Sequence, residues 1–525
     1  MSDDRGVLVR RGSGDGMGAK ESRRNTGSPG KQSDKAQTGL PRGTGLACEG
    51  GGEARSSEDA RNERRAKGPQ FQGNATSGAR VESDESLPPP EKLWKLQRTL
   101  HAKAKGNPDY RFYSLYDKLY RPDVLAEAWR RCRANAGTAG VDGVSFASIE
   151  AQGVNGWLGR LAQSLKDKSY KPDAVRRVWI PKPNGKQRPL GIPTIRDRVV
   201  QMAAVLVLEP IFEADLPDEQ YAYRAKRSAH GAIDQVHRWL QRGLREVIDA
   251  DLSGYFDTIP HTELMKSLAR RISDGALLAL LKQWLQMPVE QSDGRGGRRR
   301  SNPARRRGRG TPQGAPISPL LANLYMRRFI LGWKHLGYER RLQAHIVNYA
   351  DDFVIVCRWK AQEAYTVMAK LMRVLKLKIN QDKTRICRLP ADTFDFLGYT
   401  FGRCYSKRTG KVYLGTRPSK KKVAAVIGKI SHLTNRQSYH SETAVKVEEL
   451  NALMRGWGNY FCLGPVSTAY RAVDAHACNR LRRWLCKKHK KQGRGFGSYP
   501  DEYLYRTLGL FQLGPTTKNL PWAKA

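Results

Sequence analysis

The stretch that decides the fold is His345-Ile-Val-Asn-Tyr-Ala-Asp-Asp-Phe-Val-Ile-Val-Cys357. Short apolar runs on both sides of its two aspartates predict buried strands, and the polar residues between them predict a hairpin turn. Asp351 and Asp352 are adjacent carboxylates, and like charges held so close repel unless a cation binds them. Hard oxygen ligands of this kind suit magnesium. A solvated Asp-Asp turn without function is the alternative that this stretch leaves open.

The 525-residue chain carries a large excess of positive charge, with 93 Lys and Arg against 50 Asp and Glu and a formal net charge of +43. This excess predicts a polyanionic partner, with nucleic acid ahead of an anionic membrane. The eight cysteines form no CxxC pair, which indicates neither a disulfide framework nor a zinc ribbon. No signal peptide or bilayer-spanning run is recognisable, so we expect a cytoplasmic protein without a membrane partner.

Residues 1–90 are rich in Gly, Ser, Arg, Lys and Glu and have almost no aliphatic periodicity. Such a segment cannot bury enough apolar surface to offset the entropy of ordering it. We therefore predict a disordered tail. Non-specific contact with RNA and a passive role both remain open for it.

A second predicted strand, beginning at Val247 and Ile248, also ends in carboxylates, Asp249 and Asp251. An acid at the end of a buried strand is costly unless it is paired or bound to a metal. Asp251, Asp351 and Asp352 would together hold two Mg²⁺ ions about 3.5–4 Å apart, an arrangement that serves in-line phosphoryl transfer. With a polyanionic partner, this set predicts a nucleotide polymerase.

Two further segments are predicted to face phosphate or a ligand. Val178–Ile180 and the residues after Asn184-Gly185 predict a β-hairpin whose Lys186 and Arg188 offer fixed cations to phosphate, although ordinary surface charge is the alternative. Gly310–Pro319 is a constrained Gly/Pro turn that leads into a helix, predicted over Leu320–Phe329. Backbone can approach a ligand closely at such a turn, and the polar side chain of Gln313 is expected to contact that ligand.

Residues 288–309 are unusually basic. We expect a flexible loop that contacts phosphate, with a merely solvated loop as the alternative. Its arginines are Arg295, Arg298, Arg299, Arg300, Arg305, Arg306, Arg307 and Arg309.

The remaining pattern predicts helices over Thr194–Phe212, with Pro210 interrupting the end, and over Ala361–Leu375. One strand is predicted from Phe394 to Phe401, paired with Val412–Leu414. From Pro418 onward the apolar spacing is helical. The third helix of this part would present a strongly basic side, typical of a nucleic-acid-facing module. That side includes Arg480, Arg482, Arg483, Lys487 and Lys488.

In its order of segments the chain resembles reverse transcriptases, and specifically the group II intron-encoded reverse transcriptase/maturase family, over roughly residues 91–515. The resemblance implies an α+β, right-hand polymerase fold. Fingers and palm would occupy residues 91–405, with an antiparallel sheet that carries the catalytic hairpin, and a helical thumb or maturase domain would occupy residues 406–525. The stretches that carry the resemblance are Gly137–Gly143, Ile180–Pro193, Asp251–Asp257, Thr311–Asn323, Tyr349–Asp352, Asn380 with Lys383-Thr384, Phe396–Tyr399, Leu450-Asn451 and Arg455–Tyr460.

The resemblance also implies residue roles. Asp251 and Asp351 would ligate both metals with the Leu252 carbonyl, and Asp352 would complete the set. Lys186 and Arg188 would bind triphosphate, Phe256 would reject a 2′-hydroxyl, Gln313 would contact nucleotide and template, and Lys383 would protonate pyrophosphate. The primer would be gripped by Phe396, Leu397, Gly398 and Tyr399. Charge, and not the resemblance, predicts RNA contacts by Arg298, Arg299, Arg300, Arg305, Arg306, Arg307, Arg482, Arg483 and Lys487.

The implied function is RNA-directed DNA synthesis together with maturase activity, which assists splicing and intron mobility. Its partners would be group II intron RNA, an RNA template with a DNA primer, dNTPs and target DNA, in a nucleoid-associated bacterial ribonucleoprotein. Only a dozen residues follow Leu513, and they contain no Cys-rich His-Asn-His nuclease module, so we expect no target-site nicking. A splicing-only maturase with a vestigial polymerase and a repurposed, defence-type reverse transcriptase are the competing readings.

Overall fold

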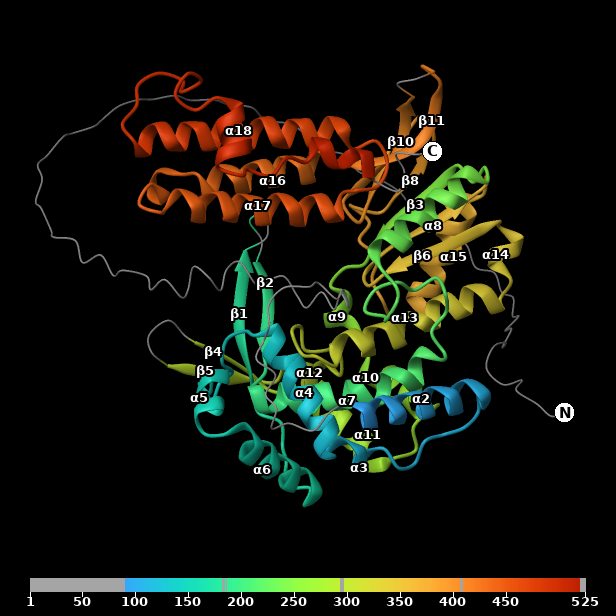
Figure 1. The fold of residues 1–525 in the computed structure, drawn as a ribbon. Coiled ribbons are helices and arrows are strands. Elements are labelled where there is room, and N and C mark those ends of the chain that lie inside the picture. The colour runs from blue at the N-terminus through green and yellow to red at the C-terminus, as the bar shows by residue number, and fades with distance from the viewer. Residues whose placement is uncertain (1–89, 182–184, 186, 293–296, 407–408, 520–525) are drawn as a thin grey trace, which may run out of the picture. The chain divides into compact units, whose positions relative to one another are not determined.

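The computed structural model describes residues 90–181, 185, 187–292, 297–406 and 409–519 (Figure 1). The predicted disordered tail, residues 1–90, therefore lies outside the described part except for Pro90. The prediction of a mixed helix and sheet fold with a helical C-terminal region is confirmed. Among the described residues, none of the helices combines the length and apolar character needed to cross a bilayer.

Helices gather in the N-terminal part of the described chain around α7, Ile195–Glu213, which is buried on nearly all sides. The prediction that Pro210 interrupts this helix is wrong, because the helix continues to Glu213. Proline cannot donate to the carbonyl four residues earlier, and Gln97 Nε2 donates to that carbonyl, Leu206 O, instead at 2.8 Å. The other helices here are α2 Glu91–Gly106, α3 Tyr116–Leu119, α4 Pro122–Asn135, α5 Phe146–Ala151 and α6 Val154–Lys166.

A four-stranded sheet has the order β2-β1-β4-β5. The predicted hairpin strands are confirmed as antiparallel β1, Val175–Pro181, and β2, Gln187–Ile192. Their turn, with Lys186, lies outside the described residues. The expected flexible loop over residues 288–309 is wrong where described, because β4 (Val289–Ser292), β5 (Arg298–Ser301) and α12 (Pro303–Arg307) form there.

Long-range pairing explains that difference. Val289 is buried and pairs in parallel with Val175 of β1, and Val175 N donates to Pro288 O at 2.8 Å. The Asn302 side chain caps α12 by accepting from Arg305 N, and its Nδ2 donates to Gln286 O. One apolar anchor and one cap thus order a strongly basic segment.

The central sheet has the order β6-β7-β3-β8, all antiparallel. Its strands are β6 Ala344–Tyr349, β7 Asp352–Cys357, β3 Glu246–Asp251 and β8 Arg385–Arg388. Alternation along β7 sends Phe353, Ile355 and Cys357 into one hydrophobic cluster and Val354 and Val356 into another. The strand is therefore buried on both faces, as its continuous apolar run predicted.

Helices cover both faces of this sheet (Figure 1). The cluster on one face includes residues of α13, Ser318–His335, and of α15, Ala361–Val374, and the cluster on the other includes residues of α8, Ala229–Gln241. The prediction for α13 covered only its middle, Leu320–Phe329. The shorter neighbouring helices are α9 Tyr255–Thr258, α10 His261–Ala269, α11 Gly275–Leu285 and α14 Tyr338–Arg341.

A three-stranded sheet follows, in the order β11-β10-β9. The single strand predicted over Phe394–Phe401 is wrong. It consists of β9, Phe394–Phe396, and β10, Tyr399–Tyr405, which pair with each other, and β11 is Val412–Pro418. Leu397 (φ 51°) and Gly398 (φ 86°) reverse the chain between them. The reversal stacks Phe394 on Phe401 with ring centroids 4.8 Å apart.

The C-terminal helices are α16 Lys420–Leu433, α17 Thr443–Tyr460 and α18 Ser467–Lys488, which share a separate hydrophobic cluster. Ser419 caps α16 as predicted, because its side chain accepts from Lys422 N. Arg483 and Lys487 are exposed on α18. The placement of Arg482 on an exposed basic side is wrong: only 2% of the residue is exposed, it forms an ion pair with Asp501, and it donates to Tyr499 O.

Candidate active site

The turn between β6 and β7 is held by Asn348, which sequence reasoning did not select. Its buried side chain donates from Nδ2 to Ala350 O at 2.9 Å and to Asp352 O at 3.4 Å. Ala350 has φ 59°, a left-handed conformation that non-glycine residues adopt only where contacts fix it. The sequence offers one signal for this role, namely that Asn348 is a polar residue inside an otherwise apolar strand. Asn348 therefore fixes the backbone that presents Asp351 and Asp352.

The structure brings the three predicted carboxylates together. Asp251, at the end of β3, is directly opposite Asp352 in the β3–β7 ladder, and Asp351 precedes Asp352 in the turn. Residues directly opposite each other in antiparallel strands project to the same face of the sheet. Burial raises the pKa of Asp352 to about 7, and the charges of Asp351 and Asp251 add to this increase. The positive charge of Lys383 lowers the pKa, but by less. The three carboxylates thus repel one another.

Asp251 is fixed by residues between α15 and β8. Asn380 Nδ2 donates to Asp251 Oδ2 at 2.9 Å, and Asn380 N donates to Asp251 O at 2.8 Å. Lys383 Nζ lies 3.2 Å from both carboxylate oxygens. Asp251 N donates to Thr384 Oγ1 at 3.3 Å. Lys383, predicted to act on pyrophosphate, therefore contacts Asp251 from this segment.

Nowhere in the described ranges do three or more His, Cys, Asp or Glu side chains converge as a metal site. Lys383 instead contributes positive charge at Asp251. The donor chemistry nevertheless fits a divalent cation, because hard carboxylate oxygens repel one another at one edge of the sheet. Asp251, Asp351 and Asp352 are the residues that could hold such an ion. Leu252, whose carbonyl was expected to help, is buried beside Asp251 and bridges to Ile379.

Three predicted nucleotide-binding residues lie on neighbouring backbone segments. Gln313 links two elements, because its Oε1 accepts from Arg188 Nε at 3.0 Å and its Nε2 donates to Asp257 Oδ2 at 2.7 Å. Phe256 O accepts from Thr311 N at 2.7 Å. The loop that carries Gln313 is thereby tied to both β2 and α9.

Gly314 shows why this loop needs glycine. It has φ 105°, and a Cβ atom there would lie 2.5 Å from Gly191 O. Gly191 N in turn donates to Gln313 O at 2.7 Å. The close approach of the two backbones, expected from the Gly/Pro composition, thus occurs against strand β2.

Tyr223 is a partly buried tyrosine whose pKa responds to the charges of the site, and sequence reasoning assigned it no role. Burial, then the charges of Asp351 and Tyr349, raise its pKa to about 12, while Arg188 lowers it. The ring therefore lies within electrostatic reach of both the carboxylates and the predicted triphosphate cation. It has φ 56°. One tyrosine among 21 carries no sequence signal that would single it out.

The predicted primer grip is tied to the C-terminal helices. Phe396 and Tyr399 are buried, whereas Leu397 and Gly398 are partly exposed. Tyr399 Oη donates to Tyr460 O at 2.5 Å, and Tyr460 Oη donates back to Leu397 O at 2.8 Å. Of the four residues predicted to grip the primer, Leu397 and Gly398 alone therefore present accessible surface.

The predicted RNA-binding arginines of β5 and α12 are all exposed. They are Arg298, Arg299, Arg300, Arg305, Arg306 and Arg307. Arg298 Nη1 lies 3.3 Å from Glu290 Oε1, across the strand pair, in an exposed ion pair that contributes little to stability. In the described chain, none of these arginines contacts the three aspartates.

Comparison with known proteins defines the class. Residues 180–401 match the family model for reverse transcriptase (RNA-dependent DNA polymerase), and residues 423–498 match that for the group II intron maturase-specific domain. The first range includes all three carboxylates, and the second covers most of α16 to α18. The chain is thus an RNA-directed DNA polymerase with a maturase domain, and such polymerases use divalent metal ions.

Two individual relatives indicate which group of reverse transcriptases the chain is similar to. The chain is 35% identical to Protein YkfC of Escherichia coli (strain K12) over 369 residues, which cover 62% of this chain and 93% of that protein. It is 34% identical to the group II intron-encoded protein LtrA of Lactococcus lactis subsp. cremoris over 382 residues, covering 59% of this chain and 60% of LtrA. The chain belongs to the group II intron-encoded reverse transcriptase/maturase family.

Among solved structures, a partial Cas6-RT-Cas1–Cas2 complex contains a similar chain. The TM-score is 0.31 and the identity is 22%, over 50% of this chain and 41% of that chain. This likeness is too distant to support an argument.

Proposed function

We propose that Asp251, Asp351 and Asp352 hold two Mg²⁺ ions and catalyse nucleotidyl transfer to the 3′ end of a DNA primer on an RNA template. The observation that carries this proposal is the register that puts Asp251 opposite Asp352, beside Asp351. When bound, the ions would activate the 3′-hydroxyl and neutralise the leaving pyrophosphate. The Leu252 carbonyl follows Asp251 directly and would complete the oxygen ligands.

The nucleotide would lie between the carboxylates and β2. Arg188 is close enough to Gln313 to share a hydrogen bond, so one guanidinium can orient the amide and bind triphosphate. Phe256, buried under the Thr311 backbone, would restrict space at the 2′ position. Lys383, released from Asp251 when metal binds, would be free to donate a proton to pyrophosphate. Lys186 would add a second cation from the β1–β2 turn.

Intron RNA and template would bind through exposed arginines and through the C-terminal helices. We assign this role to Arg298–Arg300, Arg305–Arg307, Arg483 and Lys487, and withdraw it for the buried Arg482. The division into fingers and palm over residues 91–405 and a thumb or maturase domain over residues 406–525 is part of the same proposal. Target DNA, intron mobility and a nucleoid-associated bacterial ribonucleoprotein complete it.

The test of the proposed polymerase site is Mg²⁺-dependent cDNA synthesis by Asp351→Ala on an annealed RNA template and DNA primer. Loss of the metal ligand should lower the rate by more than about 100-fold. Binding of the intron RNA and splicing assistance should persist, because the variant leaves the exposed arginines in place. Asp382→Ala is a matched control, because Asp382 is an exposed acid near Lys383 for which no role is proposed. Undiminished synthesis by Asp351→Ala would overturn the assignment.

The competing function, a splicing-only maturase with a vestigial polymerase site, predicts no Mg²⁺-dependent synthesis by the parent chain. Asp251 lies opposite Asp352 and contacts Lys383, and Gln313 is bonded to Arg188, an arrangement that favours an active polymerase. The same primer-extension measurement on the unmodified chain separates the two functions.

A further inference from the structure

A pocket of about 850 Å³ lies at the end of the β6–β7 hairpin remote from the catalytic turn. His345 of β6 lines it, as does Arg358, which directly follows β7. Since a strand rises about 3.3 Å per residue, His345 is roughly 13 Å along β6 from Tyr349 at the turn. The pocket is therefore separate from the three carboxylates.

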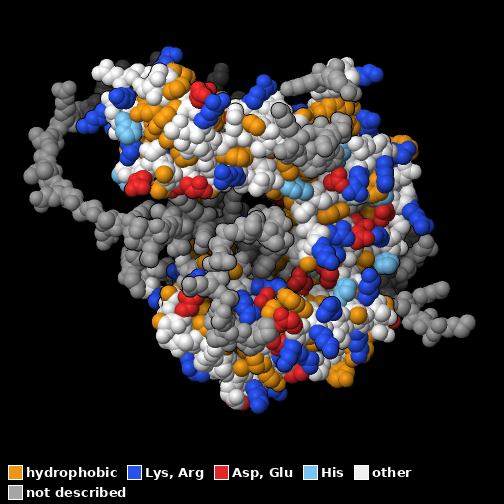
Figure 2. All heavy atoms as spheres, in the orientation of Figure 1, with side chains coloured by type: hydrophobic (Ala, Val, Ile, Leu, Met, Phe, Trp, Pro, Cys, Tyr) orange, Lys and Arg blue, Asp and Glu red, His pale blue; other side chains and the backbone are white. Residues whose placement is uncertain are grey.

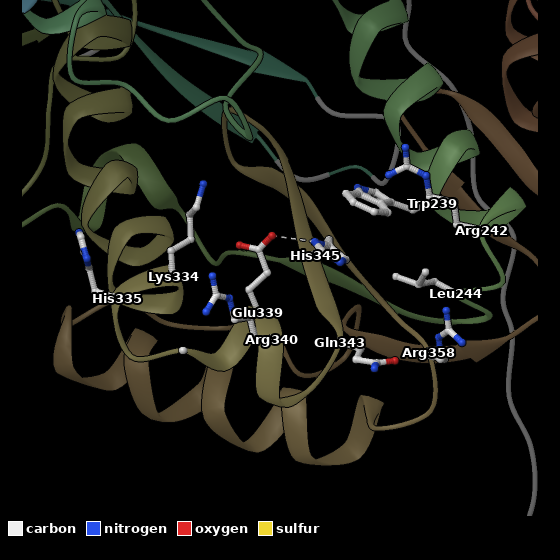
Figure 3. A pocket seen from close by; sticks show the side chains of 11 residues that line it. Trp239, Arg242, Leu244, Lys334, His335, Glu339, Arg340, Gln343, His345 and Arg358 are labelled. Atoms are coloured by element: carbon white, nitrogen blue, oxygen red, sulfur yellow. Dashed lines mark hydrogen bonds and ion pairs between the residues drawn. The ribbon is translucent and has the colours of Figure 1, made fainter.

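Helices α8, α13 and α14 also bring side chains to this pocket (Figure 3). Trp239 belongs to α8 and Arg242 follows it, Glu339 and Arg340 belong to α14, and Lys334 belongs to α13. In the face that Figure 2 shows, Lys and Arg side chains gather over the region of α8, β6 and α14.

The pocket contains a stacked pair of aromatic rings. Trp239 and His345 lie with ring centroids 3.8 Å apart and planes inclined by 9°. The Arg242 guanidinium lies over Trp239, 4.9 Å from a ring centroid. His345 is oriented by Glu339, whose Oε1 lies 2.8 Å from His345 Nδ1. The two rings are thus stacked on each other and held in place while remaining partly exposed, as a preformed aromatic surface of the kind on which unpaired bases stack.

Cations around these rings exceed the acids available to pair with them. Glu339 is the sole carboxylate in the lining, and it is engaged by His345. Lys334 is neutralised by Glu219, with Nζ 2.7 Å from Oε1. Arg242, Arg340 and Arg358 are exposed, and none of them forms an ion pair with a carboxylate of the described residues. These three guanidinium groups therefore keep their hydrogen-bond donors available, and each is able to bind phosphate through two parallel hydrogen bonds.

We propose that this pocket binds an unpaired segment of RNA, with a base stacking in the Trp239–His345 pocket and flanking phosphates held by Arg242, Arg340 and Arg358. Rings alone would suit many ligands, and guanidinium groups alone would suit any anion. The combination suits nucleotides joined by phosphates. This inference rests on the proposed function in one respect, namely that the chain works on RNA. It adds a binding site outside the residues assigned to that function.

The first experiment measures binding of a short, single-stranded oligoribonucleotide by the full chain over a range of salt concentrations. The triple variant Arg242→Ala, Arg340→Ala, Arg358→Ala should bind at least about tenfold more weakly, because charge-assisted hydrogen bonds are lost. Its salt dependence, as the slope of log K against log salt, should become shallower by about two, since each phosphate contact contributes about 0.7. The charge-matched control replaces the exposed Arg98, Arg111 and Arg160 with alanine and should change the affinity by less than about threefold.

A second measurement does not depend on any variant. The same oligomer carrying 4-thiouridine is photocrosslinked to the parent chain, and peptides that contain Trp239 or His345 should carry the label. An oligodeoxyribonucleotide with 4-thiothymidine is run in parallel and should label these peptides less.

These results are separable from those of the polymerase site. Asp351→Ala should keep the pocket crosslinks while losing cDNA synthesis, and the triple variant should retain synthesis on a short annealed template-primer. Unchanged affinity and salt slope in the triple variant, crosslinks absent from both peptides, or labelling by the DNA oligomer alone would overturn the pocket proposal. None of these outcomes would affect the assignment of the three carboxylates.

Discussion

The two ends of the β6–β7 hairpin carry opposite charge. At the turn, Asp351 and Asp352 face Asp251, and Lys383 is the cation that meets them. At the other end, three arginines surround the Trp239–His345 stack, and the one lining acid is engaged by histidine. The buried apolar residues in the middle of the hairpin lie between the acidic end and the basic end. The chain therefore keeps a group of acids at the turn apart from a group of arginines at the other end of the hairpin, so that neither group neutralises the other.

The largest expected effect tests the acidic end with two aspartates of the same strand. Asp251→Asn should reduce Mg²⁺-dependent cDNA synthesis more than about 100-fold, because it removes a ligand that would serve both ions. Asp249, two residues earlier, pairs with Arg385 instead, and Asp249→Asn should cost less than about tenfold. Single-turnover primer extension measures both variants. Equal losses would mean that strand integrity, and not the metal ligand, is being tested.

A smaller effect is expected at Gln313, which connects the acidic end with the cationic strand β2. Gln313→Ala removes hydrogen bonds to Arg188 and Asp257, and kcat/KM for dNTP should fall about 10- to 100-fold. Gln343→Ala, at the other end of the hairpin, should leave kcat/KM within about twofold. Steady-state dNTP titration gives the comparison, and an unaffected Gln313 variant would remove this residue from the nucleotide site.

Two adjacent arginines of α18 allow a buried, ion-paired cation to be compared with an exposed one. Arg482 is buried and paired with Asp501, so Arg482→Ala should lower the free energy of unfolding by about 2 kcal/mol, a value reduced because Asp501 is largely exposed. Arg483 is exposed, and Arg483→Ala should change stability by less than about 0.5 kcal/mol while weakening RNA binding. Thermal unfolding and RNA titration of both variants measure the two quantities. The reverse pattern would contradict the burial of Arg482.

The smallest effect concerns the raised pKa of Asp352, which is caused first by burial and then by the charges of Asp351 and Asp251. The pKa of Asp352 in the folded chain, about 7, lies above its ordinary value of 3.8. Its contribution to the free energy of unfolding is therefore fully present below about pH 4, where the carboxyl is protonated in both the folded and the unfolded chain. That contribution is lost as pH rises through about 7, because the folded chain then has to hold the charged carboxylate. In Mg²⁺-free buffer at about pH 8, Asp352→Asn should stabilise the chain by about 0.5 kcal/mol, a small value because this side chain is partly solvated. Near pH 4 the two chains should unfold at similar temperatures, and a pH-independent difference would contradict a raised pKa of Asp352 in the folded chain.

Local pattern predicted the parts of the molecule whose structure depends on neighbours in sequence. The β6–β7 strands, the turn at Asp351-Asp352, the β1–β2 strands and the cap at Ser419 follow from alternation, turn residues and a capping side chain. That Asp251 lies beside this turn depends on the pairing of β3 with β7, which local pattern does not predict. The family resemblance supplied the expectation that the three aspartates act together. The structure brings these residues together as the sequence indicated.

The features that were missed depend on contacts between distant residues. The β4–β5 pair forms because Val289 joins Val175, and an arginine-rich segment gives no hint of that partner. Arg482 occupies a polar position of a helix by periodicity, yet Asp501 and Tyr499 cover it. The chain reversal at Leu397-Gly398 interrupts a continuous β-forming pattern, and pairing of Phe396 with Tyr399 stabilises it. Sequence alone could not supply these partners.

The most direct test of the central claim is to count the metal ions held at the acidic end of the hairpin. Mn²⁺ in place of Mg²⁺ is titrated by electron paramagnetic resonance into the complex of the full chain with template, 3′-deoxy-terminated primer and dNTP. The parent should bind two ions that Asp351→Asn loses, whereas the Arg242, Arg340, Arg358 triple variant should bind both. Two ions retained by Asp351→Asn would contradict the account.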